Sequence, residues 1–346
     1  MKEGSKVLLI YTGGTIGMIE DPETGVLKAF DFENLTEQIP ELSRIDVELE
    51  AVTLHPPVDS SEMCPKKWGE IATLIFDNYE KFDGFVVLHG SDTMAYTSSA
   101  LSFMLQGLKK PVLLTGSQLP IGTIRTDGKE NLITAIEIAA TKTKEGEALV
   151  QEVAIYFEYA LYRGNRTTKV SAHAFEAFQS PNYSLLAEAG VSIKYNNAAL
   201  YSSSFDQIHL STAMDERVAL LKIFPGFSPA IYAHLFNVKA VKAIVLETFG
   251  AGNGPNDKTF HEFIKTYIDS GGIVVNVTQC FSGAVDQGKY ANSTMFNVLG
   301  VISGKDITTE AAITKLMYLL GNSKTKTAVE EGFRSDLVGE VSLFAY

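Results

Sequence analysis

Short apolar runs alternate with amphipathic segments along the first half of the chain. The apolar runs have the length and β-branched character of buried parallel strands, and they lie at residues 7–11, 47–53, 85–88, 111–115 and 153–157. Between them, apolar positions recur at helical spacing over residues 66–79, 93–108 and 128–141. This alternation predicts an α/β fold with a mainly parallel sheet that is covered by helices on both faces.

The second half repeats the alternation after an interruption. Residues 182–215 lose the rhythm and are rich in Ser, Asn, Ala and Tyr, which indicates a connection between domains. Further strands are predicted at residues 217–224, 241–248 and 272–278, with helices near 229–236 and 258–270 and a helix N-cap within 306–309. We therefore expect two α/β domains, a larger N-terminal one over residues 1–190 and a smaller C-terminal one over 216–346, joined by residues 191–215.

Composition narrows the class of protein. The 346 residues are 45% hydrophobic and 20% charged, with a formal net charge of −12, which argues against nucleic acid or an anionic membrane as partner because both attract a basic face. No apolar stretch approaches the roughly 20 residues that cross a bilayer, and the run after Lys6 is too short for a signal-peptide core. Cys64 and Cys280 offer neither a disulfide framework nor metal-ligand spacing. We expect a cytoplasmic protein that uses no metal.

The first predicted strand runs directly into a glycine-rich turn, Thr12-Gly13-Gly14-Thr15-Ile16-Gly17. Adjacent glycines allow a tight turn whose backbone N–H groups face a ligand, and the Thr15 hydroxyl lies just past it. The spacing of the glycines does not fit the dinucleotide fingerprint G-x-G-x-x-G. Taken alone, the motif is equally consistent with a structural turn in which Thr15 is a local cap.

Two more predicted strands end in the same way. One is followed by His89-Gly90-Ser91-Asp92-Thr93 and the other ends in Thr115-Gly116-Ser117. By itself the first of these favours helix capping, with His89 as a packed, hydrogen-bonded residue. Ligands of open α/β sheets bind at the carboxyl ends of the strands. A single site lined by hydroxyls and backbone donors would therefore explain all three strand ends at once.

A basic run, Tyr162-Arg163-Gly164-Asn165-Arg166-Thr167-Thr168-Lys169, follows the fifth strand. It could be a basic surface loop of an acidic protein. Alternatively, one of its cations neutralises Asp92 and takes part in a relay of hydroxyl, lysine and carboxylate that moves a proton. The sequence leaves both interpretations open.

Together, TGGTIG at residues 12–17 and HGSDTM at 89–94 closely resemble the two signatures of bacterial-type L-asparaginases. TGSQLP at 115–120, TDG at 126–128 with Asn131, RGNRTTK at 163–169 and AFQSPN at 177–182 extend the resemblance over nearly the whole chain. VTQC at 277–280, and the expected lack of a signal peptide, make the chain similar to the cytoplasmic, type I branch. The resemblance favours a shared catalytic site over separate turns and caps.

The resemblance also implies roles for individual residues. Thr15 would be the nucleophile that attacks the side-chain amide and forms a β-aspartyl acyl-enzyme. Ser91, where the family usually has Thr, would be a second catalytic hydroxyl in a relay with Lys169 and Asp92, and Asp92 would also hold the substrate's α-ammonium. The substrate's α-amino and α-carboxylate groups would be bound by Asp59, Ser60 and Ser61, and its leaving amide would face the backbone of Ser117. No metal or cofactor is implied.

Two further departures from the family pattern concern the loop after the first motif and the C-terminal domain. Many members carry a tyrosine on that loop, where this chain has Val26, and Tyr290 is a candidate substitute. Some type I members hold a second, regulatory asparagine with a cysteine and an arginine. This chain keeps Cys280 but has Glu247 where the arginine would stand. A glutamate repels the carboxylate that an arginine clamps, so we expect weak or no cooperativity.

The resulting prediction is an enzyme that hydrolyses L-asparagine to L-aspartate and ammonia, with glutamine as a minor substrate, and that forms a homo-oligomer, either a dimer or a tetramer. The alternatives within enzymes are a glutaminase-asparaginase and a tRNA-linked amidase component, which should carry a further domain or a basic surface. The alternative from another class is a non-catalytic amino-acid-binding protein. Such a protein would be expected to have lost Thr15, Asp92 or Lys169, all of which are present.

Overall fold

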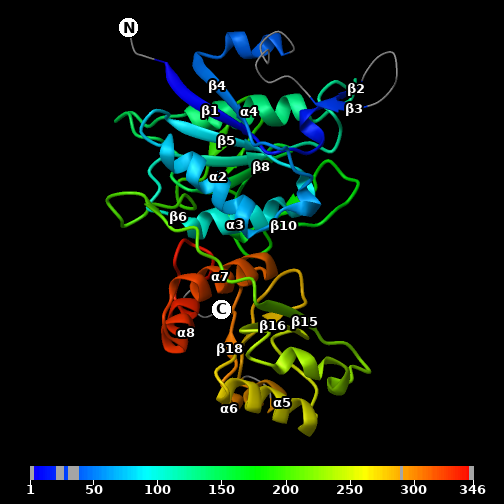
Figure 1. Ribbon diagram of the computed structural model, residues 1–346. Coiled ribbons are helices and arrows are strands. Elements are labelled where there is room, and N and C mark those ends of the chain that lie inside the picture. Colours follow the sequence, from blue (N-terminus) through cyan, green and yellow to red (C-terminus); the bar gives the residue numbers. More distant parts are fainter. Residues whose placement is uncertain (1–3, 21–26, 30–38, 289–290, 343–346) are drawn as a thin grey trace. The chain divides into compact units, whose positions relative to one another are not determined.

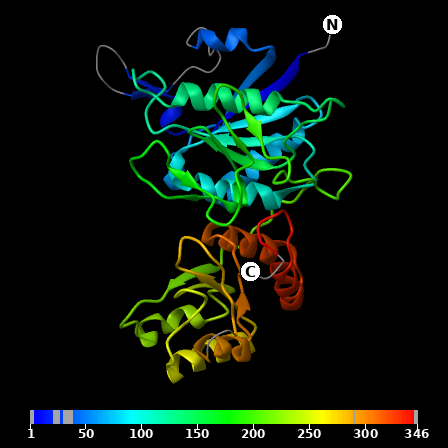
Figure 2. The ribbon, with the colours of Figure 1, turned by 180° about the vertical axis from the view of Figure 1, so that it is seen from behind.

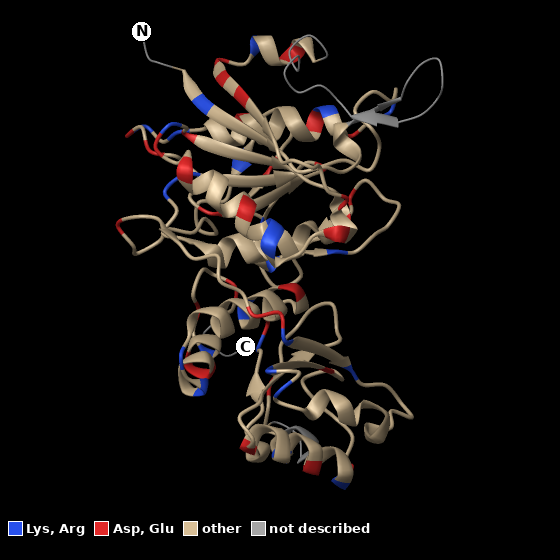
Figure 3. Cartoon of the chain, in the orientation of Figure 1, with Lys and Arg blue, Asp and Glu red and all other residues tan. Residues whose placement is uncertain are grey.

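The computed structural model of the chain describes residues 4–20, 27–29, 39–288 and 291–342 (Figure 1). It divides into two compact units, Met1–Thr212 and Ala213–Tyr346. Figure 3 shows Asp and Glu interspersed with Lys and Arg along both units. Over the described residues, no helix has the length and apolar character that a bilayer crossing requires.

Among the described residues, eight strands form the main sheet of the first unit, in the order β13-β12-β9-β8-β7-β5-β1-β4. Its parallel part comprises β4 (Val47–Thr53), β1 (Ser5–Tyr11), β5 (Gly84–Leu88), β7 (Val112–Thr115) and β8 (Val153–Phe157). The antiparallel strands at one side are β9 (Ala160–Arg163), β12 (Ala187–Glu188) and β13 (Lys194–Tyr195). Tyr11 pairs with Leu88 and Leu88 with Thr115, so β1, β5 and β7 end level with one another.

Helices cover both faces of this sheet, as Figures 1 and 2 show. On one face lies α4 (Gly128–Ala140), whose Leu132 and Ile136 pack in one cluster with Leu9 and Val86 of the central strands. The other face is covered by α2 (Pro65–Asp77) and α3 (Met94–Met104), which contact each other. Strands whose successive residues are all buried, such as β5, require cover on both sides.

The second unit contains a parallel sheet in the order β15-β16-β17-β18, counted over the described residues. Its strands are β15 (Val218–Lys222), β16 (Ala243–Thr248), β17 (Ile273–Thr278) and β18 (Ile302–Ser303). Its helices are α5 (Lys258–Asp269), α6 (Ala291–Leu299), α7 (Thr309–Asn322) and α8 (Lys326–Arg334). The Thr308 hydroxyl accepts a hydrogen bond from the Ala311 N–H and so caps α7, within the predicted N-cap segment.

The predicted fold class is confirmed: both units are α/β, and each carries a mainly parallel sheet. All the predicted strands are present, each within two residues of its expected ends. The helix predicted over 93–108 is too long, because residues 105–106 leave it as β6 (Leu105–Gln106) to pair with β14 (His209–Leu210). The segment predicted as a helix at 229–236 is the 3₁₀ helix η7 (Pro229–Phe236), while α6 and α8 were not predicted.

The remaining elements are short. Two strands, β13 and β14, lie within residues 191–215, the segment expected to connect the domains. The other short strands are β2 (Met18–Glu20), β3 (Leu27–Ala29), β10 (Thr168–Lys169) and β11 (Phe178–Gln179). Within the described residues, the other 3₁₀ helices are η1 (Thr15–Gly17), η3 (Pro40–Arg44), η4 (Ser60–Glu62), η5 (Ser91–Thr93) and η6 (Gly164–Arg166). Two of these short elements, η1 and η5, follow the level ends of β1 and β5.

Candidate active site

The glycine turn after β1 brings two other segments into contact with it. Gly13 has φ 130° and Gly14 has φ 89°, a backbone conformation that favours glycine. A Cβ on Gly13 would lie 2.1 Å from the Val58 carbonyl oxygen, and one on Gly14 would lie 2.6 Å from the Gly90 Cα. Only glycine permits both approaches. Thr15, which is half-buried and opens η1, is therefore held beside the segment that carries Ser91.

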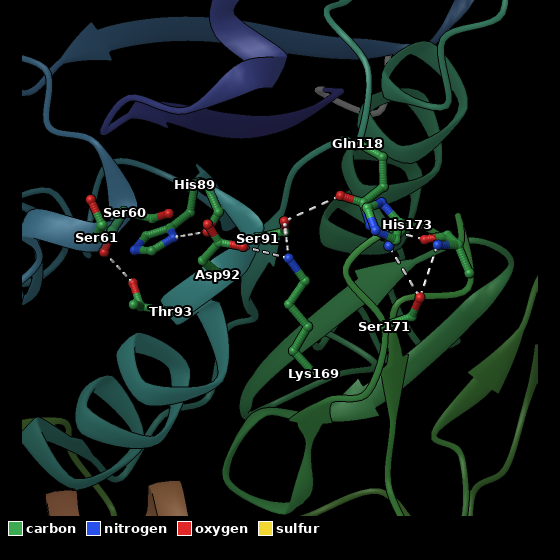
Figure 4. Close-up of polar contacts among 12 residues, drawn as sticks. Ser60, Ser61, His89, Ser91, Asp92, Thr93, Gln118, Lys169, Ser171 and His173 are labelled. Carbon is green, nitrogen blue, oxygen red and sulfur yellow. Dashed lines mark hydrogen bonds and ion pairs between the residues drawn. The ribbon is translucent and has the colours of Figure 1, made fainter.

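The segment that carries Asp59, Ser60 and Ser61 contacts both the turn after β1 and the segment that carries Ser91, and Figure 4 shows Ser60 and Ser61 beside Thr93. The Val58 N–H donates to the Thr12 carbonyl (2.7 Å), and the Thr93 hydroxyl donates to the Ser60 carbonyl (2.6 Å). Asp59 accepts from the Ser61 hydroxyl (2.6 Å) and the Ser61 N–H (2.8 Å), and these hydrogen bonds lower the pKa of the Asp59 carboxyl. Asp59 is therefore an exposed anion beside the glycine turns.

Lys169 joins Ser91 and Asp92, although it lies more than 70 residues away in the sequence. Its Nζ donates to Ser91 Oγ at 2.9 Å and to Asp92 Oδ1 at 2.5 Å (Figure 4). Asp92 keeps 70% of its side chain exposed, whereas Lys169 keeps 16%. A hydroxyl thus lies beside an amine, and a carboxylate balances the charge of that amine. Such a group of three side chains can accept a proton and return it. The structure therefore brings these three predicted residues into one hydrogen-bonded group.

The basic run that carries Lys169 is largely inside the first unit. Arg163 forms a buried ion pair with Glu152 (Nε to Oε2, 2.7 Å) and donates to the Ala199 carbonyl (2.8 Å). Only 4% of Arg163 and 3% of Arg166 is exposed. The interpretation of this run as a basic surface loop is therefore wrong for both arginines. They hold β9 and η6 in place, and Lys169 follows in β10, which pairs with β11.

The third strand end is anchored by a carboxylate that sequence reasoning did not single out. Asp127 accepts from the Gln118 N–H (2.9 Å) and the Leu119 N–H (3.1 Å), and Asn131 donates to the Gly116 carbonyl (3.0 Å). Ser117 is 3% exposed and its hydroxyl donates to the Leu119 carbonyl (2.6 Å). The only sequence signal for Asp127 was its place in the TDG motif. Because the His89 N–H donates to the Thr115 carbonyl (2.9 Å), this strand end also adjoins the Ser91 segment.

His89 is a packed structural residue, as its sequence context predicted. Its ring is fully buried, with Nδ1 2.6 Å from the Gly90 carbonyl oxygen and Nε2 2.8 Å from the Thr97 hydroxyl. The Trp68 indole N–H donates to that same hydroxyl (2.9 Å), so Thr97 donates to Nε2 and the ring proton lies on Nδ1. Burial lowers the pKa of His89 to about 4. The ring is neutral near pH 7 and holds the Gly90 backbone.

The remaining predicted residues lie elsewhere. Val26 and Tyr290 fall outside the described residues. Glu247 and Cys280 belong to the second unit, where the Glu247 carboxylate accepts from the Thr309 hydroxyl (2.8 Å) and pairs with Lys222 (3.2 Å). Cys280 is exposed.

Comparisons with known proteins agree with this arrangement. The family model described as "Asparaginase, N-terminal" matches residues 6–201, and that of the "Glutaminase/Asparaginase C-terminal domain" matches residues 217–333. L-asparaginase 1 of Escherichia coli (strain K12) is 39% identical over 339 residues, which cover 97% of this chain and 98% of that protein. The 60 kDa lysophospholipase of Homo sapiens is 38% identical over 360 residues, which cover 97% of this chain and 61% of that longer protein.

A solved structure extends the agreement to the fold. The crystal structure of L-asparaginase I from Vibrio cholerae matches with a TM-score of 0.88 and 37% sequence identity, over 98% of this chain and 100% of that one. Two family models thus cover most of the chain, and relatives above 30% identity span nearly all of it. The chain therefore belongs to the asparaginase family, as its two glycine-and-hydroxyl motifs predict.

Proposed function

We propose that this protein is an L-asparaginase that converts L-asparagine and water to L-aspartate and ammonia, with Thr15 as nucleophile. The observation that carries the proposal is the Lys169 Nζ, which bridges the Ser91 hydroxyl and the Asp92 carboxylate beside the turn that presents Thr15. Family membership and the relatives named L-asparaginase support the choice of substrate.

In the proposed reaction, the Thr15 hydroxyl oxygen attacks the side-chain amide carbon of asparagine. The C–N bond then breaks, and the proton of the hydroxyl reaches the departing nitrogen, which leaves as ammonia. Backbone N–H groups of the turns near Thr15 and Ser91 stabilise the oxyanion, a contribution of about 3 kcal/mol for each well-placed donor. Water then attacks the β-aspartyl ester of Thr15, which releases aspartate and restores the hydroxyl.

The charges around the turns fit an amino acid. In the proposal, the exposed carboxylates of Asp59 and Asp92 bind the α-ammonium, and Ser60 and Ser61 bind the α-carboxylate. The backbone of Ser117 faces the leaving amide. The Ser91–Lys169–Asp92 group transfers the protons: as a neutral amine, Lys169 takes a proton from the hydroxyl, and the Asp92 carboxylate stabilises the ammonium that forms.

We also propose that the enzyme is cytoplasmic, assembles as a homo-oligomer of two or four chains and hydrolyses glutamine only slowly. These statements rest on the resemblance to type I asparaginases. Light scattering coupled to size-exclusion chromatography tests the assembly, for which a mass near one chain contradicts the proposal.

The function is tested by ammonia release from L-asparagine and from L-glutamine by the purified protein, with hydroxylamine added in a parallel assay. An acyl-enzyme transfers its β-aspartyl group to hydroxylamine, so β-aspartyl hydroxamate should accumulate. Binding of asparagine without ammonia release would indicate the non-catalytic binding protein instead. A higher kcat/KM for glutamine than for asparagine would indicate a glutaminase.

A further inference from the structure

The side chain of Gln118 connects the Ser91 hydroxyl to a loop on the other side of the site. Gln118 lies in the turn after β7, next to Ser117. Its Oε1 is 3.4 Å from Ser91 Oγ, and its Nε2 donates to the Ala174 carbonyl at 2.9 Å (Figure 4). Ala174 belongs to the loop that follows Lys169. One amide group thus contacts both a proposed catalytic hydroxyl and the segment beyond the proposed catalytic lysine.

The orientation of this amide follows from its partners. A carbonyl oxygen can only accept, so the amide nitrogen of Gln118 must face Ala174 and the amide oxygen must face Ser91. A lysine ammonium can only donate, so Ser91 Oγ accepts from Lys169 (2.9 Å) and its own hydrogen is directed at Gln118. The Ser91 oxygen is therefore held between two defined partners, a donor and an acceptor.

Both ends of Gln118 are themselves held. Its backbone N–H donates to the buried carboxylate of Asp127 (2.9 Å). On the other side, the Ser171 hydroxyl accepts from the Ala174 N–H (2.9 Å) and the His173 N–H (3.2 Å), which fixes the turn that presents the Ala174 carbonyl. The amide oxygen consequently has a defined position before any substrate binds.

Serine needs such a partner more than threonine does. An unbranched hydroxyl side chain can occupy three staggered χ1 rotamers, whereas a second heavy atom on Cβ restricts that choice. Ser91 is half-buried, in a short 3₁₀ turn, and its side chain lacks the second Cβ substituent that would restrict χ1. Even the long contact with Gln118 (3.4 Å) can therefore shift the population of Ser91 rotamers toward the one that contacts Lys169.

We propose that Gln118 is a positioning residue that selects the χ1 rotamer of Ser91 and thereby keeps its hydroxyl on Lys169. When Lys169 is a neutral amine, the hydroxyl hydrogen can rotate about the C–O bond from Gln118 toward Nζ, so fixing the oxygen does not prevent proton transfer. The expected effect on kcat rests on the proposed function of the site. The expected effect on the Ser91 rotamer does not.

The kinetic test is a double-mutant cycle of Gln118→Met with Ser91→Thr. Gln118→Met keeps the length of the side chain and removes both polar atoms. It should lower kcat for asparagine by about 3- to 10-fold, the range of one neutral hydrogen bond, with KM nearly unchanged. In the Ser91→Thr background the loss should be less than about 2-fold, because threonine restricts its own rotamer. Equal losses in both backgrounds, or no loss in either, would overturn the proposal.

Ser171→Ala is the matched control, since it loosens the loop but leaves the Gln118 oxygen in the chain. Because the loop reaches Ser91 through the Gln118 amide, Ser171→Ala should lower kcat less than Gln118→Met does and should cause no further loss in the Gln118→Met background. A loss larger than that of Gln118→Met would make the loop and not the amide oxygen the cause, and would overturn the proposal.

A structural readout separates this proposal from the function itself. Crystal structures of the wild type, the Gln118→Met variant and the double variant report the χ1 rotamer at position 91 whether or not the protein is active. We expect one rotamer in the wild type, more than one in Gln118→Met and one in the double variant. If Gln118→Met shows the same single rotamer as the wild type, the role of Gln118 is overturned. If the rotamers are as expected but the wild type does not hydrolyse asparagine, only the proposed function is overturned.

Discussion

The two parallel sheets of this protein end in similar residues but use them differently. In the first unit, β1 is followed by Thr15 and β5 by Ser91, and the Ser91 hydroxyl accepts a hydrogen bond from Lys169. In the second unit, β16 and β17 end at Thr248 and Thr278. The Thr248 hydroxyl donates to Asn276 Oδ1 (2.6 Å) and that of Thr278 donates to the Gly250 carbonyl (2.6 Å).

The difference shows what turns a strand end into a site. Parallel topology puts both sets of hydroxyls at the carboxyl edge of a sheet, where ligands usually bind. A hydroxyl becomes reactive when a group that can exchange protons contacts it. In the second sheet the Thr248 hydroxyl donates to an amide oxygen and the Thr278 hydroxyl to a carbonyl, and the latter also accepts from the Cys280 backbone N–H (3.0 Å). There the nearby charge, Glu247, is bound by Lys222 and Thr309.

The largest effect should come from removing the hydroxyl of Thr15. Thr15→Ala should lower kcat by roughly 10³-fold or more, as the loss of a nucleophile does in other hydrolases, and should leave the melting temperature close to that of the wild type. Thr278→Ala is the matched change in the second sheet and should leave ammonia release unchanged. Near-normal turnover by Thr15→Ala would remove the distinction between the two sheets.

The second effect concerns the proton relay. Lys169→Met should lower kcat by about 10²- to 10⁴-fold with a small change in KM, because in the proposed relay the lysine acts on proton transfer and not on the charges of the substrate. Asp92→Asn should impair both kcat and KM, since the proposal also gives Asp92 the α-ammonium. Steady-state kinetics with asparagine measures the split. A rise in KM alone for Lys169→Met would make the lysine a binding group.

The third effect compares the buried ion pair of each unit. Arg163 pairs with Glu152 in the first, and Lys315 pairs with Glu340 in the second, with each side chain at most 6% exposed. Removing one partner leaves a buried charge, so Arg163→Met and Lys315→Met should each lower the free energy of unfolding of their own unit by about 3–5 kcal/mol. Urea unfolding of the two variants, followed with a probe in each unit, measures the loss.

The two variants should differ in activity. Arg163 holds the segment that leads to Lys169, so Arg163→Met should also lower kcat per folded molecule, whereas Lys315→Met should not. Lys265→Met is the control for stability, because Lys265 pairs with Asp269 on the exposed face of α5 and such pairs contribute at most about 1 kcal/mol. Equal stability of Lys315→Met and Lys265→Met would contradict this prediction.

The smallest effect is expected at Glu247. Coupling between sites is typically about 1–3 kcal/mol, so one reversed charge at a regulatory site can abolish it. Because Glu247 is a carboxylate held by Lys222 and Thr309, the dependence of rate on asparagine concentration should be hyperbolic. A sigmoidal curve that Cys280→Ala converts to a hyperbola would contradict this prediction. It would show that the second sheet also binds asparagine, at a working regulatory site.

Much of the fold could be predicted because its signals are local. The strands of both units are continuous apolar runs, and the buried faces of β5 and β8 need no knowledge of their neighbours to be recognised. Predictions failed where a distant partner decides the conformation. The end of α3 is one example, because Leu105 and Gln106 pair with residues 209–210 and leave the helix.

The candidate site divides in the same way. Glycines and hydroxyls at strand ends form a recognisable local pattern, and together with the resemblance to asparaginases this pattern made Thr15, Ser91 and Asp92 candidates. The tertiary structure decided which cation contacts Ser91. Arg163 and Arg166 are buried within the first unit, whereas Lys169 donates to the Ser91 hydroxyl. It also revealed Gln118 and Asp127, whose roles depend on hydrogen bonds to segments far along the chain. Sequence determines which groups are available, and long-range packing determines which of them meet, because the contacts that orient a side chain come from residues that no local pattern encodes.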